Sequence, residues 1–290
     1  MSTAELSTAT LSSQETQHVI KLTLNVHRDL FHAYLELTPH VPLSKITLKI
    51  PPGAPIPTYS LKENKHAPAA CGLAAFPGLV NSSIAEEHRP QLYTSLLKWN
   101  ECDFAVQTFL PSLQTQLSDR VPGTQAQWII VSGVKQKVKF QQSGKGKEPR
   151  HSAFLITVPS ADGEARFIAD FTVEQFGYGS GMWFGPEVEY VAAVTEGGEY
   201  VVADMEAELA SNKWDGEQKK GQDRLRRICE ELRWEGVEKL ERKDRVRYLY
   251  AYYGNLLQAE ESSTENLHKV SLQVVAEAGY LEAGIPIVED

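Results

Sequence analysis

The chain of 290 residues has only three cysteines, Cys71, Cys102 and Cys229, and no CxxC pair. An odd set of widely spaced cysteines argues against both a disulfide scaffold and a cysteine-rich zinc site. The eight histidines include no HxxxH pair with a carboxylate on one helix, and neither GxGxxG after a strand nor GxxxxGK[ST] occurs. A zinc hydrolase and a nucleotide-binding protein therefore have no support, and we expect no metal and no cofactor.

Long apolar runs and basic stripes are also missing. No stretch of about 18 apolar residues is present, and the N-terminal MSTAELSTATLSSQETQ lacks the charged start and apolar run of a secretory signal. Acidic residues outnumber basic ones by 38 to 29, giving a net charge of −9, whereas binding to a phosphate backbone requires positive charge. We therefore expect a soluble cytoplasmic protein that takes a small-molecule or peptide substrate, with no nucleic acid and no membrane as partner.

What is present is the composition of a globular protein, with 42% hydrophobic and 23% charged residues. We expect an α+β protein in which an antiparallel sheet packs against a helix that carries a nucleophile, followed by a helical C-terminal region. Three parts are predicted: a disordered, Ser/Thr/Gln-rich tail over 1–16, an α+β core domain over 17–204, and the helical region over 205–290, packed on the core.

Periodicity assigns the elements within these parts. Alternation predicts a strand over 18–27, a proline-rich turn closes another over 43–57, and loop follows as far as residue 70. A strand pair is expected over 188–194 and 199–202, turned by Glu196-Gly197-Gly198. Apolar residues lie at helical spacing over 90–99 and again over 102–117. Strands over 152–158 and 166–173 are joined by Asp162-Gly163, a strong hairpin signal. Charged helices are expected over 223–240 and 244–259, with a third near 265–278.

Three polar residues fall at chemically suggestive places in this order. Cys102 begins a predicted helix, where the dipole and free amide groups favour a thiolate and offer donors to an oxyanion. His151 starts one strand, and Asp170 lies near the end of the next, so antiparallel pairing brings imidazole and carboxylate side by side. A thiol nucleophile needs a base, and the base needs a third group that holds its ring.

The segments WNECDFAVQTFL, RHSAFLITV and RFIADFTVEQFG resemble in order the core of the papain-like and transglutaminase-like cysteine enzymes. The resemblance covers less than half of the chain. It implies that Cys102 is the nucleophile, that His151 is general base and then general acid, and that Asp170 orients the imidazole. Trp99, Asn100 and Gln175 are candidates for oxyanion or positioning contacts.

Each candidate has a structural alternative. Cys102 shares a helix face with Phe109 and is equally interpreted as a core thiol, while His151 is alternatively a surface residue. Asp170 stands in the apolar segment IADFT, where a carboxylate without a partner is costly, and this favours a specific partner. Cys71 is the competing nucleophile. In GYGSGMWFGP, Trp183 and Phe184 are either ligand contacts at a pocket rim or parts of a packed loop.

Two functions of different classes follow. The first is a thiol-dependent acyl-transfer enzyme, a peptidase, deamidase, amidase or transferase acting on an amide-type bond. The second is a non-catalytic binding or regulatory protein that keeps an enzyme-like core and binds partners through its helical region. The sequence does not identify the substrate or the oligomeric state.

Overall fold

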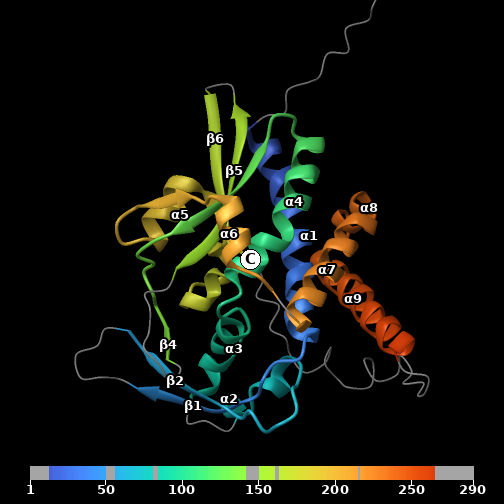
Figure 1. Ribbon diagram of the computed structural model, residues 1–290. Coiled ribbons are helices and arrows are strands. Elements are labelled where there is room, and N and C mark those ends of the chain that lie inside the picture. Colours follow the sequence, from blue (N-terminus) through green and yellow to red (C-terminus); the bar gives the residue numbers. More distant parts are fainter. Residues whose placement is uncertain are drawn as a thin grey trace, which may run out of the picture.

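A five-stranded antiparallel sheet forms the centre of the protein. The computed structural model describes residues 13–49, 56–80, 84–141, 150–160, 163–214 and 216–264 (Figure 1). The strand order of this sheet is β7-β6-β5-β3-β8. Its strands are β3 (Gln125–Val131), β5 (His151–Ser160), β6 (Gly163–Ala169), β7 (Phe184–Pro186) and β8 (Tyr200–Val202). Within the described residues, the expected antiparallel sheet is confirmed.

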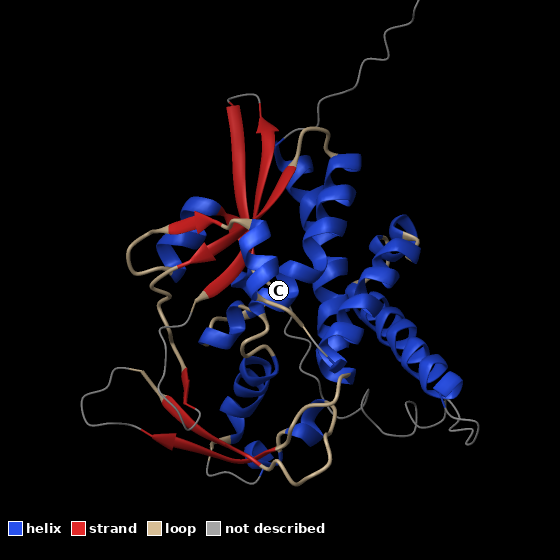
Figure 2. Cartoon of the chain, in the orientation of Figure 1, coloured by secondary structure: helices blue, strands red, loops and turns tan. Residues whose placement is uncertain are grey.

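A smaller sheet lies at the opposite end of the molecule from the β5–β6 turn (Figure 2). It has the order β1-β2-β4, in which β2 is antiparallel to β1 and parallel to β4. Its strands are β1 (Leu43–Lys49), β2 (Thr58–Glu63) and β4 (Lys139–Gln141). The expected strand over 43–57 is present as β1, whereas β2 was assigned to loop.

Helices cover one side of the five-stranded sheet in successive layers. The helices of the described residues are α1 (Ser13–Leu37), α2 (Pro77–Val80), α3 (Arg89–Leu97), α4 (Cys102–Arg120), α5 (Glu187–Val194), α6 (Met205–Ser211), α7 (Gly216–Glu231), α8 (Trp234–Glu238) and α9 (Arg242–Thr264). Helix α4 packs directly on β3 and β5, α1 packs on α4, and α9 packs on α1 (Figure 1). The expected helical C-terminal region is confirmed as far as Thr264, and the third helix expected near 265–278 lies outside the described residues.

Helix α4 connects the sheet to the C-terminal helices. Its buried residues recur at helical spacing, so one face packs on the sheet and another meets α1 and α7. Pro111 lies inside the helix and has no N–H to donate to the carbonyl of Gln107. The Arg226 guanidinium of α7 donates to that carbonyl at 3.0 Å. The proline therefore leaves the Gln107 carbonyl without a donor from within α4, and the C-terminal region supplies one.

The strand expected over 18–27 is wrong, because this segment belongs to helix α1. Its apolar residues do alternate over ten positions, but the longer segment also buries Ile20, Leu24, Phe31 and Leu35 at helical spacing. The packing of this buried face against α4 and α9 stabilises a helix rather than a strand. The helix begins at Ser13, so the last residues of the expected tail are helical, and residues 1–12 lie outside the described part.

The strand expected over 188–194 is also wrong and forms helix α5. The β-branched valines favoured a strand, yet only Tyr190 and Val194 are buried, one helical turn apart, and Val188 is 78% exposed. Glu187 and Glu189 in the first turn suit the positive end of the helix dipole. The hairpin of β5 and β6 is present as expected, although Asp162 at its turn is outside the described residues.

Candidate functional site

Cys102 is the first residue of α4. The preceding helix α3 ends at Leu97, and Asn100 reverses the chain with a φ of +65°, a left-handed conformation that asparagine tolerates better than most residues. The first amide groups of a helix have no carbonyl partner within the helix. Cys102 is 7% exposed, so its thiol is nearly covered. The sulfur therefore lies beside free backbone donors at the positive end of a helix that is packed on the sheet.

His151 and Asp170 form a fully buried pair. His151 Nε2 donates to Asp170 Oδ2 at 2.6 Å, and both side chains have 0% exposure. His151 is the first residue of β5, and Asp170 follows the last residue of β6. The register places Phe154 opposite Ala169, so the two residues are diagonal neighbours on adjacent strands. The surface interpretation of His151 is wrong, and the partner expected for Asp170 is His151.

The charges of this pair stabilise each other. Burial alone lowers the pKa of His151, but the charge and hydrogen bond of Asp170, followed by the hydrogen bond and charge of Cys102, raise it to about 10. Burial raises the pKa of Asp170, but the charge of His151 and the hydrogen bonds from His151, Tyr190 and Thr172 keep it below its usual value. An imidazolium paired with a carboxylate is therefore the favoured state at neutral pH.

Cys102 is close enough to His151 to contribute to the raised pKa of the imidazole. Nε2 of the ring is bound to Asp170, so Nδ1 is the nitrogen that does not contact the carboxylate. The arrangement of sulfur, imidazole and carboxylate that a thiol nucleophile needs stays a prediction.

Gln175 contacts Nδ1 of the His151 ring, and Asn100 contacts Gln175. Gln175 Nε2 is 3.4 Å from His151 Nδ1, and the backbone N–H of Asn100 donates to Gln175 Oε1 at 3.1 Å. This hydrogen bond turns the amide group of Gln175 toward the ring. Asn100 thus contributes through its backbone, whereas its side chain is exposed. The role of both residues as oxyanion or positioning contacts stays a prediction.

The aromatic candidates pack rather than form an open rim. Trp183 is 1% exposed, its carbonyl accepts from the Asp170 N–H at 2.7 Å, and Arg28 lies 4.7 Å from its ring centroid. Phe184 is half-buried and stacks on Phe167, and Trp99 is half-buried against Phe140. Contact of these three aromatic residues with a substrate stays a prediction.

Two contacts of Asp170 were not predicted from the sequence. Tyr190 Oη donates to Asp170 Oδ2 at 2.6 Å, and the Thr172 N–H donates to Oδ1 at 2.9 Å. Thr172 lies two residues after an aspartate, which is an Asx-turn signal that the sequence offered. Tyr190 offered none, because it stood in a segment that was assigned to the wrong element.

A buried ion cluster supports the loop that carries Gln175. Glu174 accepts from Arg28 Nη2 at 2.6 Å and from Lys98 Nζ at 2.8 Å, and all three side chains are at most 8% exposed. Ser95 Oγ also donates to the Glu174 carbonyl at 2.6 Å. Helices α1 and α3 therefore hold the turn Val173–Phe176 in place through charge and hydrogen bonds.

The two other thiols have different surroundings. Cys71 is half-buried at the start of a short 3-10 turn, and its Sγ donates to the Leu37 carbonyl at 3.3 Å. Cys229 is 5% exposed on α7, and burial raises its pKa to about 12. Cys229 is therefore a core thiol, as the sequence indicated, while the choice between Cys102 and Cys71 needs an experiment.

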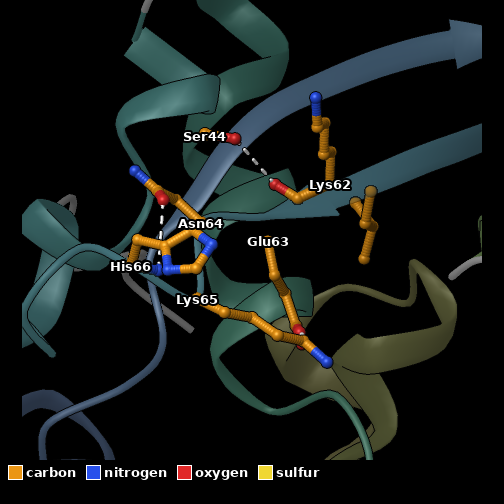
Figure 3. Close-up of a pocket in the computed structure, with 7 residues that line it drawn as sticks. Ser44, Lys62, Glu63, Asn64, Lys65 and His66 are labelled. Atoms are coloured by element: carbon orange, nitrogen blue, oxygen red, sulfur yellow. Dashed lines mark hydrogen bonds and ion pairs between the residues drawn. The ribbon is translucent and has the colours of Figure 1, made fainter.

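The pocket drawn in Figure 3 is lined by none of the candidate residues. It is lined by Ser44, Leu61, Lys62, Glu63, Asn64, Lys65 and His66. The contacts within it are local: Ser44 Oγ donates to the Lys62 carbonyl and the His66 N–H to Asn64 Oδ1. The side chains come from β1, the end of β2 and the residues after it, and none is a nucleophile with a neighbouring base. We assign it no chemistry.

Within the described ranges, no group of three or more His, Cys, Asp and Glu side chains is arranged to hold a metal ion. No helix there is both long and apolar enough to span a bilayer. Comparisons with family models, with curated proteins and with solved structures found no match to this chain.

Proposed function

We propose that this protein is a thiol-dependent acyl-transfer enzyme that acts on an amide-type bond, with a core of the papain-like and transglutaminase-like kind. Cys102 is the nucleophile, His151 the general base and then the general acid, and Asp170 the group that orients the imidazole. The observation that carries this proposal is the buried ion pair of His151 and Asp170, with Gln175 at the other ring nitrogen and Cys102 among the groups that raise the pKa of His151.

The order of the atoms matches the chemistry of a thiolate nucleophile. In the reaction, Cys102 Sγ bonds to the carbonyl carbon of the substrate, and the oxygen becomes an oxyanion. The backbone N–H of Cys102 and Nε2 of Gln175 are the donors that we assign to it. As the bond to the leaving amine breaks, the amine takes the proton from His151 Nδ1. Water or an amine then attacks the thioester after His151 accepts its proton, and the thiolate leaves.

Burial of the pair suits this role and restricts access. Asp170 is shielded from water, which strengthens its interaction with His151. Cys102 is 7% exposed, so little of this residue is open to a substrate in this conformation. The peptidases, deamidases, amidases and transferases differ in leaving group and acceptor, so the proposal is limited to the thioester step that they share.

Selective alkylation of the thiols tests the nucleophile. The wild type and the variants Cys102→Ala and Cys71→Ala are treated with iodoacetamide at pH 7, and labelled sites are located by mass spectrometry. We expect Cys102 to be labelled in the wild type and in Cys71→Ala, and the fast phase of labelling to disappear in Cys102→Ala. Equal fast labelling of Cys102→Ala would assign the reactive thiol to Cys71 and remove the proposal.

An activated ester tests acyl transfer itself. p-Nitrophenyl acetate should give a burst of p-nitrophenol that matches the enzyme concentration, because acylation of Cys102 releases one equivalent before the thioester hydrolyses. The burst should be absent from Cys102→Ala and present in Cys71→Ala. Circular dichroism of both variants checks that each is folded.

The near closure of the site favours a second candidate function, a non-catalytic protein that retains this core. In that case Cys102 stays unlabelled in the native protein and reacts only after addition of denaturant. A burst of acylation in the folded wild type excludes this second function.

A further inference from the structure

Asp170 is surrounded by more hydrogen-bond donors than one imidazole requires. Oδ2 accepts from both His151 Nε2 and Tyr190 Oη, each at 2.6 Å. Oδ1 accepts from the Thr172 N–H at 2.9 Å and from Thr172 Oγ1 at 3.2 Å. One carboxylate oxygen is therefore shared between an imidazole and a phenol.

The second hydrogen bond to Oδ2 changes how strongly Asp170 attracts the proton of His151. A phenol that donates to Oδ2 stabilises the negative charge on Asp170, and a better stabilised carboxylate attracts the imidazolium proton of His151 less strongly. Burial and the charge of Asp170 raise the pKa of Tyr190 well above 10, so the phenol keeps its proton and remains a donor.

The position of Tyr190 is determined by helix α5. This helix packs on β6 and β7, the two strands beside Asp170. Tyr190 is 2% exposed, and Val194, one turn further, is fully buried, while Val188 on another face is 78% exposed. The helix therefore presents one polar atom to Oδ2 of the buried carboxylate, the oxygen that Thr172 does not contact.

We propose that Tyr190 is a positioning residue that holds the carboxylate of Asp170 in place and weakens the ion pair between Asp170 and His151. This deepens and rests on the proposed function, since a general acid has to release its proton to the leaving group. Too strong an ion pair keeps that proton on the imidazole.

Titration of His151 by NMR in the full chain, labelled with ¹⁵N-histidine, tests the proposal. Tyr190→Phe removes the phenol oxygen and leaves the ring. We expect the apparent pKa of His151 to rise by about 0.5 to 1 unit. This is a part of the roughly 1 to 2 units that a hydrogen bond to a charged group contributes, because the phenol acts on His151 only through Asp170. The basic limb of the pH profile for alkylation of Cys102 should move in the same direction.

Tyr178→Phe is the matched control. Tyr178 is also buried, at 3% exposure, but its Oη donates to the carbonyls of Lys135 and Ala193 and not to Asp170. Its loss should lower stability without moving the titration of His151. An equal shift in both variants would show a general effect of lost packing and overturn the role of Tyr190.

Replacing Tyr190 by 3-fluorotyrosine gives a test that retains the phenol. Fluorine makes the hydroxyl a stronger donor, so the pKa of His151 should fall, opposite to the effect of Tyr190→Phe. A purely structural role predicts no such reversal of sign, and an unchanged titration in both variants overturns the proposal. If His151 shifts while Cys102 is inert in the wild type, the proposed function fails and the role of Tyr190 in the pair stands. If Cys102 is reactive but the pKa of His151 shifts in neither variant, the proposed function stands and the role of Tyr190 fails.

Discussion

His151 Nε2 lies 2.6 Å from Asp170 Oδ2, and neither side chain is accessible to solvent. Each group is charged because the other is, since an isolated ion in the protein interior would lose its hydration without compensation. Changing one partner therefore alters the protonation of the other. Under the proposed function, we therefore expect the reactivity of Cys102 to depend on both.

Asp170→Asn should reduce the reactivity of Cys102. The amide carries no charge, so the imidazolium of His151 loses its main support and its pKa falls. We expect alkylation of Cys102 by iodoacetamide at pH 7 to slow by about 100-fold or more, the lower range of general acid–base effects. Asp103→Asn is the control, because Asp103 also lies beside Cys102 but accepts from Ser152. Equal rates for Asp170→Asn and the wild type would contradict the assigned role of Asp170.

The stability contributed by His151 should be lost at high pH. Its pKa is about 10 in the folded chain and about 6.5 when unfolded. A raised pKa gives a contribution that is fully present below pH 6.5 and disappears as the pH rises through about 10. Urea unfolding of the wild type and His151→Gln measures it. The difference in unfolding free energy between the two should shrink steadily from pH 6.5 to 9.5, and a constant difference would argue against the ion pair.

His27 should act in the opposite direction, at low pH. It is buried on α1, and its Nε2 and Nδ1 contact Ser112 Oγ at 3.0 Å and the Thr23 carbonyl at 2.9 Å. Burial, aided by the charge of Arg120, lowers its pKa to about 3. The unfolded chain then binds a proton that the folded chain does not, so stability falls as the pH drops from 6.5 toward 3. His27→Gln should show a weaker loss over this window in urea titrations.

Gln175→Ala should separate acyl transfer from simple alkylation. An oxyanion forms on an ester or amide carbonyl but not during displacement on iodoacetamide. Loss of one oxyanion donor typically lowers turnover by about 10²–10³. We expect acylation by p-nitrophenyl acetate to fall in that range, while alkylation of Cys102 changes by only a few fold. A parallel loss in both reactions would indicate that Gln175 supports the structure rather than the oxyanion.

Two substitutions in the buried ion cluster should lower the free energy of unfolding by different amounts. Glu174→Gln leaves the charges of Arg28 and Lys98 without a counter-ion, and removal of one partner from a buried pair typically costs about 3–5 kcal/mol. Lys98→Met removes a charge but keeps the pair of Arg28 and Glu174, so the loss should be smaller. Chemical denaturation of the two variants gives the comparison, and a larger loss in Lys98→Met would contradict this account.

Much of the local structure was predictable from short patterns. Helical spacing placed Cys102 at the start of a helix, and the hairpin signal joined the strands of His151 and Asp170. The segments 18–27 and 188–194 were misassigned, because alternation over seven to ten residues also fits a helix whose contacts lie further along the chain. Burial of Ile20 and Leu24 against other helices decided the first case.

The sequence by itself determined the start of α4, the hairpin of β5 and β6, the Asx turn at Asp170 and the chemistry of the three side chains, since periodicity and turn signals act over a few residues. Only the tertiary structure decided the helical state of 18–27 and 188–194, and that Tyr190 and the Asn100 amide complete the surroundings of His151 and Asp170. Those contacts join helix α5 and the α3–α4 connection to the residues after β6. They depend on how separate elements pack, and no spacing within one element encodes that.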